Sequence, residues 1–268
     1  MFSSLSKKTL SLITETSQVL KTSEVSVIRY RLEIIASRLA DSFGVPRRKR
    51  RMPDPLELLI ATILSQNTND INSHRAFTNL KNAFPKLLLL ADVQPRKIES
   101  LIRVGGIAKK KSKTIVRIVR EVKSNFEKFD SGSLRRIPRE TLIQRLCTMK
   151  GVGYKTAECV SLFALGDNDA FPVDTHVHRV LNRLGIVKEK TPDKTYLRVK
   201  NFVPYRRGYD LHLNLIKFGR KICLAQNPKC YECYLLDLCG WEEKSLQAPR
   251  KESQVDKKKV EFMLLEKV

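Results

Sequence analysis

Hydrophobic residues recur at helical spacing along most of the chain. Val27, Leu32, Ile35 and Leu39 follow this spacing within one N-terminal segment. Asp54-Pro55 is typical of a helix start, because Asp caps the first N–H groups and Pro fits the first turn. Further helices are predicted over residues 56–64, 71–84, 93–103, 112–126, 154–165, 177–184, 191–203 and 209–218.

Strand-like patterns are missing from the sequence. No stretch of useful length alternates between apolar and polar residues, and there is no repeat and no βαβ pattern. We therefore predict an all-α fold.

The charge balance is unusual for a chain of this size. The 268 residues include 51 Lys and Arg against 28 Asp and Glu, a formal net charge of +23, while the apolar content of 42% is ordinary. So basic a chain favours a polyanionic partner, through counterion release and electrostatic steering. A solubilising surface or association with ribosomes would give the same balance, and charge alone does not separate these alternatives.

Targeting signals are weak. No segment approaches the ~18 uninterrupted apolar residues of a membrane helix, and residues 1–21 lack the apolar run and cleavage site of a secretory signal. We expect no membrane association and a reducing compartment, which is the cytoplasm or nucleoid in a prokaryote and the nucleus in a eukaryote.

The segment 146–174 carries the clearest candidate chemistry. One helical pattern ends at Cys147 and another begins at Tyr154, with Gly151 and Gly153 between them, so a helical hairpin with a tight turn is predicted. Such a turn exposes N–H groups at a helix start, where an anion is favoured. Lys155 follows directly. Together with Asp174 further along the chain, this anion site and amine indicate chemistry on a nucleic-acid backbone, with Gly151, Gly153 and Tyr154 as candidate DNA contacts.

Two loops carry side chains that could enter DNA. Leu64 gives way abruptly to the polar run 65–70, which either faces DNA or simply caps the next helix. Ile107 lies at a Gly-rich tip before Lys109, so it is either a wedge between base steps or a residue docked in the core. Lys109 and its neighbouring lysines could hold phosphates.

Four of the six cysteines lie close together in the sequence. The pattern Cys223-x6-Cys230-x2-Cys233-x5-Cys239 provides four soft ligands within seventeen residues, enough for a zinc site or a four-iron, four-sulfur (4Fe-4S) cluster. In a chain without a secretion signal, such clustering predicts metal ligation and not disulfides.

These motifs also carry a family resemblance. Gly-Val-Gly-Tyr-Lys-Thr-Ala from residue 151 and Pro-Val-Asp-Thr-His from residue 172 resemble the endonuclease III branch of the helix-hairpin-helix (HhH-GPD) DNA glycosylases. The resemblance implies that Lys155 is the nucleophile and Asp174 its acidic partner, either as a base or as an electrostatic stabiliser. It also implies that Gln66 fills the gap left by an extruded base, and that a wedge lies near Ile107. One departure is Met149-Lys150, where the family often has Leu-Pro.

The same resemblance extends to the C-terminal cysteines. The 6-2-5 spacing matches the 4Fe-4S cluster of endonuclease III, which implies that Cys223, Cys230, Cys233 and Cys239 are its ligands. Lys229, in the loop between the first two ligands, could contact a phosphate.

The implied architecture has two helical lobes with DNA and the active site at the cleft. Residues 53–166 would form a six-helix module that contains the hairpin. Residues 24–52 and 167–245 would form the second lobe, with the cluster loop at 223–239. Residues 1–23 are expected to be a flexible N-terminus and residues 246–268 a charged tail.

The implied function is a bifunctional DNA glycosylase and abasic-site lyase of base excision repair. Its expected partner is double-stranded DNA with a damaged base or an abasic site, bound by a monomer, and oxidised pyrimidines are the default substrate. A mismatch glycosylase, a 5-methylcytosine glycosylase and a non-catalytic DNA-binding module are the alternatives, since hairpins of this kind are often only phosphate grips.

Overall fold

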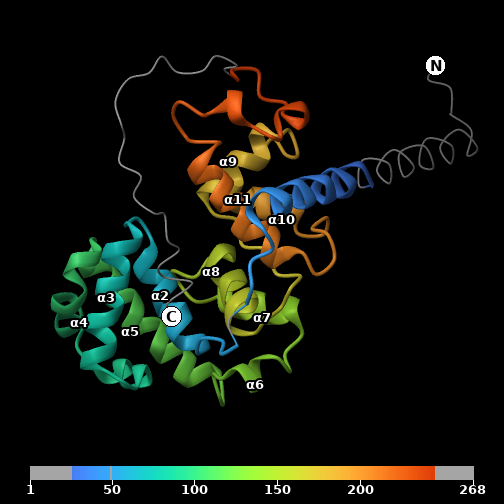
Figure 1. The fold of residues 1–268 in the computed structure, drawn as a ribbon. Helices are drawn as coiled ribbons and strands as arrows, with labels where there is room; N and C mark the ends of the chain where they lie inside the picture. The colour runs from blue at the N-terminus through green and yellow to red at the C-terminus, as the bar shows by residue number, and fades with distance from the viewer. Residues whose placement is uncertain (1–25, 49, 245–268) are drawn as a thin grey trace, which may run out of the picture.

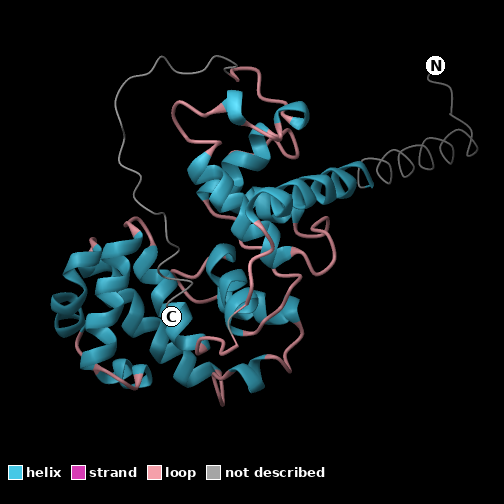
Figure 2. Cartoon of the chain, in the orientation of Figure 1, coloured by secondary structure: helices cyan, strands magenta, loops and turns pink. Residues whose placement is uncertain are grey.

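The computed structural model describes residues 26–48 and 50–244 (Figure 1). All regular structure in these ranges is helical (Figure 2), which confirms the all-α prediction. The flexible N-terminus predicted over 1–23 and the charged tail predicted over 246–268 lie outside the described residues. A first helix covers residues 26–43. It is followed by α2 (Pro55–Ser65), α3 (Asp70–Ala83), α4 (Pro95–Ile102), α5 (Ala108–Asn125), α6 (Ser131–Leu134), α7 (Arg139–Cys147), α8 (Tyr154–Cys159), α9 (Thr175–Arg183), α10 (Pro192–Val199) and α11 (Gly208–Lys221).

The helices α2 to α8 form a first group, in which α2 contacts α3, α5 and α8. The Asp54 carboxylate accepts the N–H groups of Leu56 and Glu57 at 2.9 and 3.1 Å, as the predicted cap requires. Nearly every residue from Pro55 to Leu64 is buried, because α2 contacts α3, α5 and α8 at once. The long apolar run of this helix is therefore explained by neighbours on several sides.

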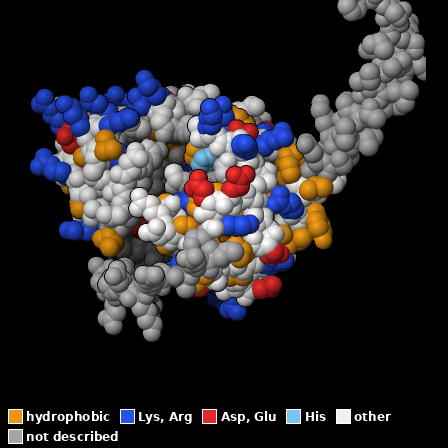
Figure 3. All heavy atoms as spheres, turned by 90° about the horizontal axis from the view of Figure 1, so that it is seen from above, with side chains coloured by type: hydrophobic (Ala, Val, Ile, Leu, Met, Phe, Trp, Pro, Cys, Tyr) orange, Lys and Arg blue, Asp and Glu red, His pale blue; other side chains and the backbone are white. Residues whose placement is uncertain are grey.

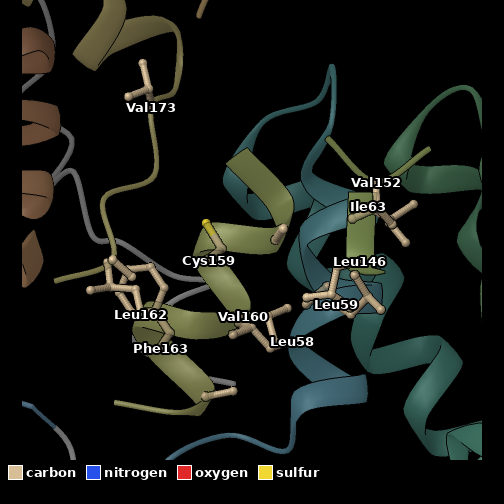
Figure 4. Close-up of a cluster of buried hydrophobic side chains, with 14 of the residues drawn as sticks. Leu58, Leu59, Ile63, Leu146, Val152, Cys159, Val160, Leu162, Phe163 and Val173 are labelled. Atoms are coloured by element: carbon tan, nitrogen blue, oxygen red, sulfur yellow. The ribbon is translucent and has the colours of Figure 1, made fainter. Parts of the chain in front are cut away.

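Part of this core joins α2 to the hairpin (Figure 4). Leu58 of α2 lies beside Val160, and both are fully buried. Val152, at the tip of the hairpin turn, is 5% exposed and packs with Ile63 and Leu146. The turn that follows α7 is thus held on α2 by its one apolar tip residue.

The second group of helices combines both ends of the described chain. The helix over 26–43 lies beside α10 and α11 (Figure 1). Arg31 on this helix donates to the carbonyls of Leu184 and Gly185, after α9, and to that of Leu238 in the C-terminal loop. One guanidinium therefore ties the N-terminal helix to segments more than 150 residues away.

Three helices differ most from their predicted extents. The helix α5 begins at Ala108, four residues before the predicted start, and α10 ends at Val199 and not at residue 203. The helix predicted over 154–165 is α-helical only to Cys159 and then continues as a π-helical turn, η3 (Val160–Ala164). Turns of this type are rare and occur often at functional sites. In the ranges that the structure covers, no helix is both long and apolar enough to span a membrane.

Candidate active site

The hairpin turn depends on one glycine more than on the other. Gly151 has φ of 106°, and a Cβ placed there would lie 2.7 Å from Cγ2 of Thr114 on α5. Both the backbone conformation and this close contact therefore exclude a side chain at residue 151. Gly153, in contrast, has extended backbone (φ −101°) and open space around it. We infer that Gly153 leaves room beside the start of α8, where no side chain caps the helix. Of the two glycines of the turn, Gly151 alone has a positive φ.

Residues around the turn replace the rigidity that the Met149-Lys150 departure removes. Met149 is 1% exposed and its carbonyl accepts the N–H of Val152 at 2.9 Å. Arg117 of α5 donates to the Lys150 carbonyl at 2.7 Å. Tyr154, the first residue of α8, stacks on Tyr196 of α10 with ring centroids 4.8 Å apart. The turn is thus fixed to both neighbouring helices.

Lys155 and Asp174 line the same cavity, which has a volume of about 490 Å³. Lys155 lies in the first turn of α8, and Asp174 is the N-cap of α9. Oδ1 of Asp174 accepts the N–H of Val177 at 2.8 Å, which fixes the carboxylate at the helix start. Gln66, the C-cap of α2, lines this cavity too. Three of the predicted site residues, distant in sequence, therefore meet at one place.

An ion pair lies at the same cavity. Arg220 of α11 donates to Asp70 of α3 at 2.8 Å, and both residues line the cavity. The pair joins α3 to α11 at the cavity that Lys155 and Asp174 also line.

A buried thiol lies one helical turn after the candidate nucleophile. Cys159 is fully buried, as the sequence pattern suggests for a small apolar core residue. Burial raises the pKa of the Cys159 thiol, and the neighbouring Lys155 amine opposes this shift. The raised pKa keeps the Cys159 thiol neutral beside the Lys155 amine.

His212 is a cavity residue that the sequence analysis did not single out. It is 1% exposed, and neither ring nitrogen has a hydrogen bond of regular geometry to the described residues. The edges of Phe163 and Phe171 approach the imidazole with centroids 5.8 and 6.4 Å away. Burial lowers the pKa of His212 to about 4, and the charge of Lys155 acts in the same direction. The imidazole is therefore neutral at physiological pH.

This burial predicts an acid sensitivity that the variant His212→Leu should lack. An unfolded histidine titrates near 6.5, so between pH 6.5 and 4 the unfolded state binds a proton that the folded state excludes. Stability is full above pH 6.5 and falls as the pH drops through this window. Denaturant unfolding at pH 7.5 and 4.5 should show a loss about 2–3 kcal/mol larger in the wild type than in His212→Leu. Equal losses in the two proteins would contradict the assignment.

A buried carboxylate network fixes α8 against the loop that carries Asp174. Glu158 of α8 is fully buried. It accepts from Nη2 of Arg139 at 2.9 Å, from the Tyr196 hydroxyl at 2.7 Å and from the N–H of Phe171 at 2.8 Å. Nε of Arg139 also lies 3.0 Å from Asp167. Because Phe171 lies three residues before Asp174 and Glu158 three residues after Lys155, the Phe171–Glu158 hydrogen bond joins the two segments that carry Lys155 and Asp174.

The role of Glu158 is not among the predictions from the sequence, although the sequence contains a signal for a buried carboxylate. It is the one carboxylate within the otherwise apolar or small run from Thr156 to Leu165, and a lone acid in such a run indicates a paired, buried group. Burial and the Glu158 charge both raise the pKa of Tyr196, so its hydroxyl remains a donor to the carboxylate.

Ile107 is exposed and not docked in the core. Its side chain is 53% exposed, and its φ of 50° lies in the left-handed region. A β-branched residue rarely adopts that conformation, because its side chain crowds the backbone. The docked alternative from the sequence is therefore wrong. Neither Ile107 nor Lys109 lines the cavity of Lys155.

The basic run after Ile107 is divided. Lys109 and Lys110 are exposed, whereas Lys111 is 5% exposed. Nζ of Lys111 donates to the carbonyls of Leu64 at 2.7 Å and Gly105 at 2.9 Å. Lys111 is thus turned away from any bound phosphate, which leaves Lys109 and Lys110 for that role.

The four clustered cysteines line a second, small cavity with Trp241 and other apolar side chains. All four thiols are free. Burial raises the pKa of the Cys233 thiol to about 11, and the three other thiols raise it further. Among the described residues, no three Cys, His, Asp or Glu side chains are placed to hold a single metal ion.

Basic groups surround this second cavity. Arg183 approaches Sγ of Cys223 at 3.5 Å, stacks on Trp241 at 4.0 Å, and its carbonyl accepts from the Cys239 thiol at 3.4 Å. Lys229 lies here and not at the cavity of Lys155, and its ammonium is 3.7 Å from Glu232. Residues 223–239 therefore form a site separate from that of Lys155.

The chain resembles known proteins in sequence and in fold. Residues 60–204 match the family model described as HhH-GPD superfamily base excision DNA repair protein. Endonuclease III of Thermotoga maritima is 36% identical over 192 residues, which is 72% of this chain and 85% of that protein. A putative DNA glycosylase of Arabidopsis thaliana is 40% identical over 170 residues, 63% of this chain and 57% of that protein.

Solved structures agree with the sequence matches. A trapped endonuclease III–DNA covalent intermediate superposes with a TM-score of 0.65 at 28% identity, covering 79% of this chain and 95% of that one. The family match includes the hairpin, Lys155 and Asp174. The chain therefore belongs to the HhH-GPD superfamily of base excision DNA repair proteins, in its endonuclease III branch.

Proposed function

We propose that the chain is a DNA glycosylase with abasic-site lyase activity, acting in base excision repair. The observation that carries the proposal is the meeting of Lys155, Asp174 and Gln66 at one cavity beside the hairpin. A primary amine and a carboxylate at such a cavity are the groups that covalent attack on a sugar needs. The family membership supports the same reaction class.

The surface favours duplex DNA as the partner. Figure 3 shows the molecule from above, with a hollow between its left-hand and right-hand parts. Lys and Arg side chains gather along the upper edge of the left-hand part. The hairpin turn, with Gly151, Gly153 and Tyr154 at its end, would hold a phosphate at the uncapped start of α8. Lys109 would hold another. The net charge of +23 makes a strong salt dependence of DNA binding an expected property.

The reaction requires the target nucleotide to leave the stack, because its anomeric carbon is inaccessible inside a duplex. Gln66 would fill the gap and Ile107 would enter beside it as a wedge. An exposed, strained apolar residue supports that assignment, since strain persists mainly where function uses it.

Lys155 would act as the nucleophile. Its Nζ forms a bond to C1′ as the C1′–base bond breaks, and the base departs with that electron pair and takes up a proton. The nitrogen lone pair then expels O4′ from C1′, and O4′ takes up a proton released by the amine, which leaves the opened sugar joined to Lys155 as an imine. Loss of the C2′ proton and the 3′ phosphate by β-elimination nicks the strand, and water releases the lysine. Asp174 supplies the negative charge beside the amine, where positive charge develops.

Damaged pyrimidines are the proposed substrate class. The mismatch glycosylase stays an alternative of the same fold, with Lys155 at the cavity and the adjacent Tyr154 stacked on Tyr196. The proposal is tested by borohydride trapping on one duplex with an abasic site and another with thymine glycol. A covalent adduct on both is expected. An adduct on the abasic duplex alone would redirect the search to mismatched or methylated bases, and no adduct on either would overturn the lysine mechanism.

We propose that Cys223, Cys230, Cys233 and Cys239 hold a 4Fe-4S cluster. Four free thiols around one apolar cavity fit this group, because each thiolate of such a cluster binds a different iron. Zinc fits less well, since it needs its ligands around one ion. When bound, the cluster would supply folding free energy to the C-terminal loop. Lys229 remains a proposed phosphate contact at the edge of this loop.

The cluster proposal predicts a coloured protein that contains about four iron ions per chain. In Cys230→Ser one ligand is lost, so the iron content and the visible absorption should fall together, and thermal unfolding should shift to lower temperature. Cys147→Ser is the matched control, because Cys147 lies outside the cavity. One zinc ion per chain and no iron would refute the proposal.

We also propose that residues 53–166 form the hairpin module and that 24–52 and 167–245 form the second lobe. The grouping of the helices in Figure 1 supports this division, as does the position of Lys155 and Asp174 on opposite sides of the proposed boundary at 166.

A further inference from the structure

Lys111 connects the two loops to which DNA insertion is assigned. Its ammonium donates to the Leu64 carbonyl, two residues before Gln66, and to the Gly105 carbonyl, two residues before Ile107. The two bonds measure 2.7 and 2.9 Å. Both bonds come from the same ammonium, so one side chain joins the two loops.

The link is electrostatically suited to its place. Leu64 is in the last turn of α2, where carbonyl groups lack helical partners and a cation is favoured. Gly105 ends the 3₁₀ turn η2 (Arg103–Gly105), which packs so closely on α3 that an added Cβ would lie 3.0 Å from Cβ of Ala76. A buried ammonium therefore bridges the backbone of the Leu64 and Gly105 segments.

Each loop holds a residue with left-handed backbone just beyond the anchored carbonyl, and for the β-branched Ile107 this backbone is strained. Asn67 has φ of 52° and Ile107 has φ of 50°. Such conformations persist only where the surroundings fix the backbone. Lys111 provides that fixation on both sides at once, because its charge cannot leave the carbonyls without being buried unpaired.

We propose that Lys111 is a positioning residue that sets the distance between the Gln66 loop and the Ile107 loop, so that plug and wedge enter the duplex in register. This inference rests on the proposed function. It assigns to Lys111 no contact with DNA, in contrast to its exposed neighbours Lys109 and Lys110. Burial lowers the pKa of Lys111 to about 8, in agreement with an ammonium held inside the protein.

The variant Lys111→Met tests the proposal, with Lys109→Met and Lys110→Met as matched controls. Single-turnover base release from a thymine glycol duplex should fall at least about tenfold in Lys111→Met, because small displacements of inserted groups are costly. Nicking of a preformed abasic site, which needs less distortion of the duplex, should change less than about twofold. The salt slope of DNA binding should stay that of the wild type, whereas each control should reduce the slope by about one.

A double-mutant cycle separates positioning from general destabilisation. If Lys111 acts through the Gln66 loop, Gln66→Ala should cost much less in the Lys111→Met background than in the wild type, because coupled sites are not additive. Additive effects, or equal losses in base release and abasic nicking, would overturn the proposal. A wild type that neither nicks nor releases a base would instead refute the proposed function.

Should Lys111→Met fail to fold, Lys111→Arg carries the same comparison. Arginine retains a buried cation with several donors, but its longer side chain alters the spacing of the two loops. A selective loss of base release is again expected. A wild-type ratio of base release to abasic nicking in a folded Lys111→Arg protein would contradict the inference.

Discussion

Replacing Lys155 with glutamine should abolish borohydride trapping and reduce both base release and strand nicking at least about a thousandfold. The amide cannot form an imine, while its size and polarity keep the cavity filled. DNA affinity should fall only slightly, because one charge of many is lost. The measurement is single-turnover cleavage together with a binding titration at two salt concentrations.

The control for this variant is Lys150→Gln, in the same hairpin. Lys150 is exposed, and only its backbone carbonyl is anchored, by Arg117. Its replacement should weaken binding by the loss of one charge and leave the trapped adduct intact. Full nicking by Lys155→Gln would show that another amine is the nucleophile, whereas loss of binding in that variant would point to a structural role.

The second large effect is expected for Glu158→Ala. Removal of this carboxylate leaves the Arg139 guanidinium, the Tyr196 hydroxyl and the Phe171 N–H without their buried acceptor. Breaking a buried ion pair from one side typically costs about 3–5 kcal/mol. The free energy of unfolding should fall by that amount, and base release should fall as well, since the Phe171–Asp174 segment loses its anchor to α8.

Two further variants make this result interpretable. Glu140→Ala removes an exposed carboxylate from α7 and should change stability by less than about 0.5 kcal/mol. Glu158→Gln keeps an acceptor for Tyr196 or Phe171 and should lose less stability than Glu158→Ala. If Glu158→Ala has the same free energy of unfolding in urea as the wild type, the network does not contribute to stability.

The sequence predicted helices well and their ends less well. The Asp54-Pro55 start was recognisable because capping is local chemistry, and α2 indeed begins at Pro55. The end of α10 at Val199 depends on how the following loop packs, and the change to a π-helical turn after Cys159 has no local signal that we can identify.

The candidate site shows the same division. Lys155 and Asp174 could be proposed because a motif marks both, and the structure places them at one cavity. His212 could not, since it reaches that cavity from α11 through the fold alone.

The spacing of apolar residues in α5 indicates that Lys111 is buried, contrary to the phosphate contact predicted for it. It was grouped with the exposed lysines, although it lies three residues after Ala108 and four before Ile115, on the buried face of α5. A charged residue at an apolar position of a helical pattern indicates a buried, paired group more than a phosphate contact.

The left-handed backbone at Ile107 sets stability against activity. In the free protein, this conformation costs about 1–3 kcal/mol, and the side chain gains little in return because it is 53% exposed. Glycine at this position would relieve the strain, so a screen for thermostability alone should select it. Under the proposed wedge role of Ile107, the resulting enzyme would be harder to melt and poorer at opening a duplex, so selection for stability and selection for repair would favour different residues at position 107.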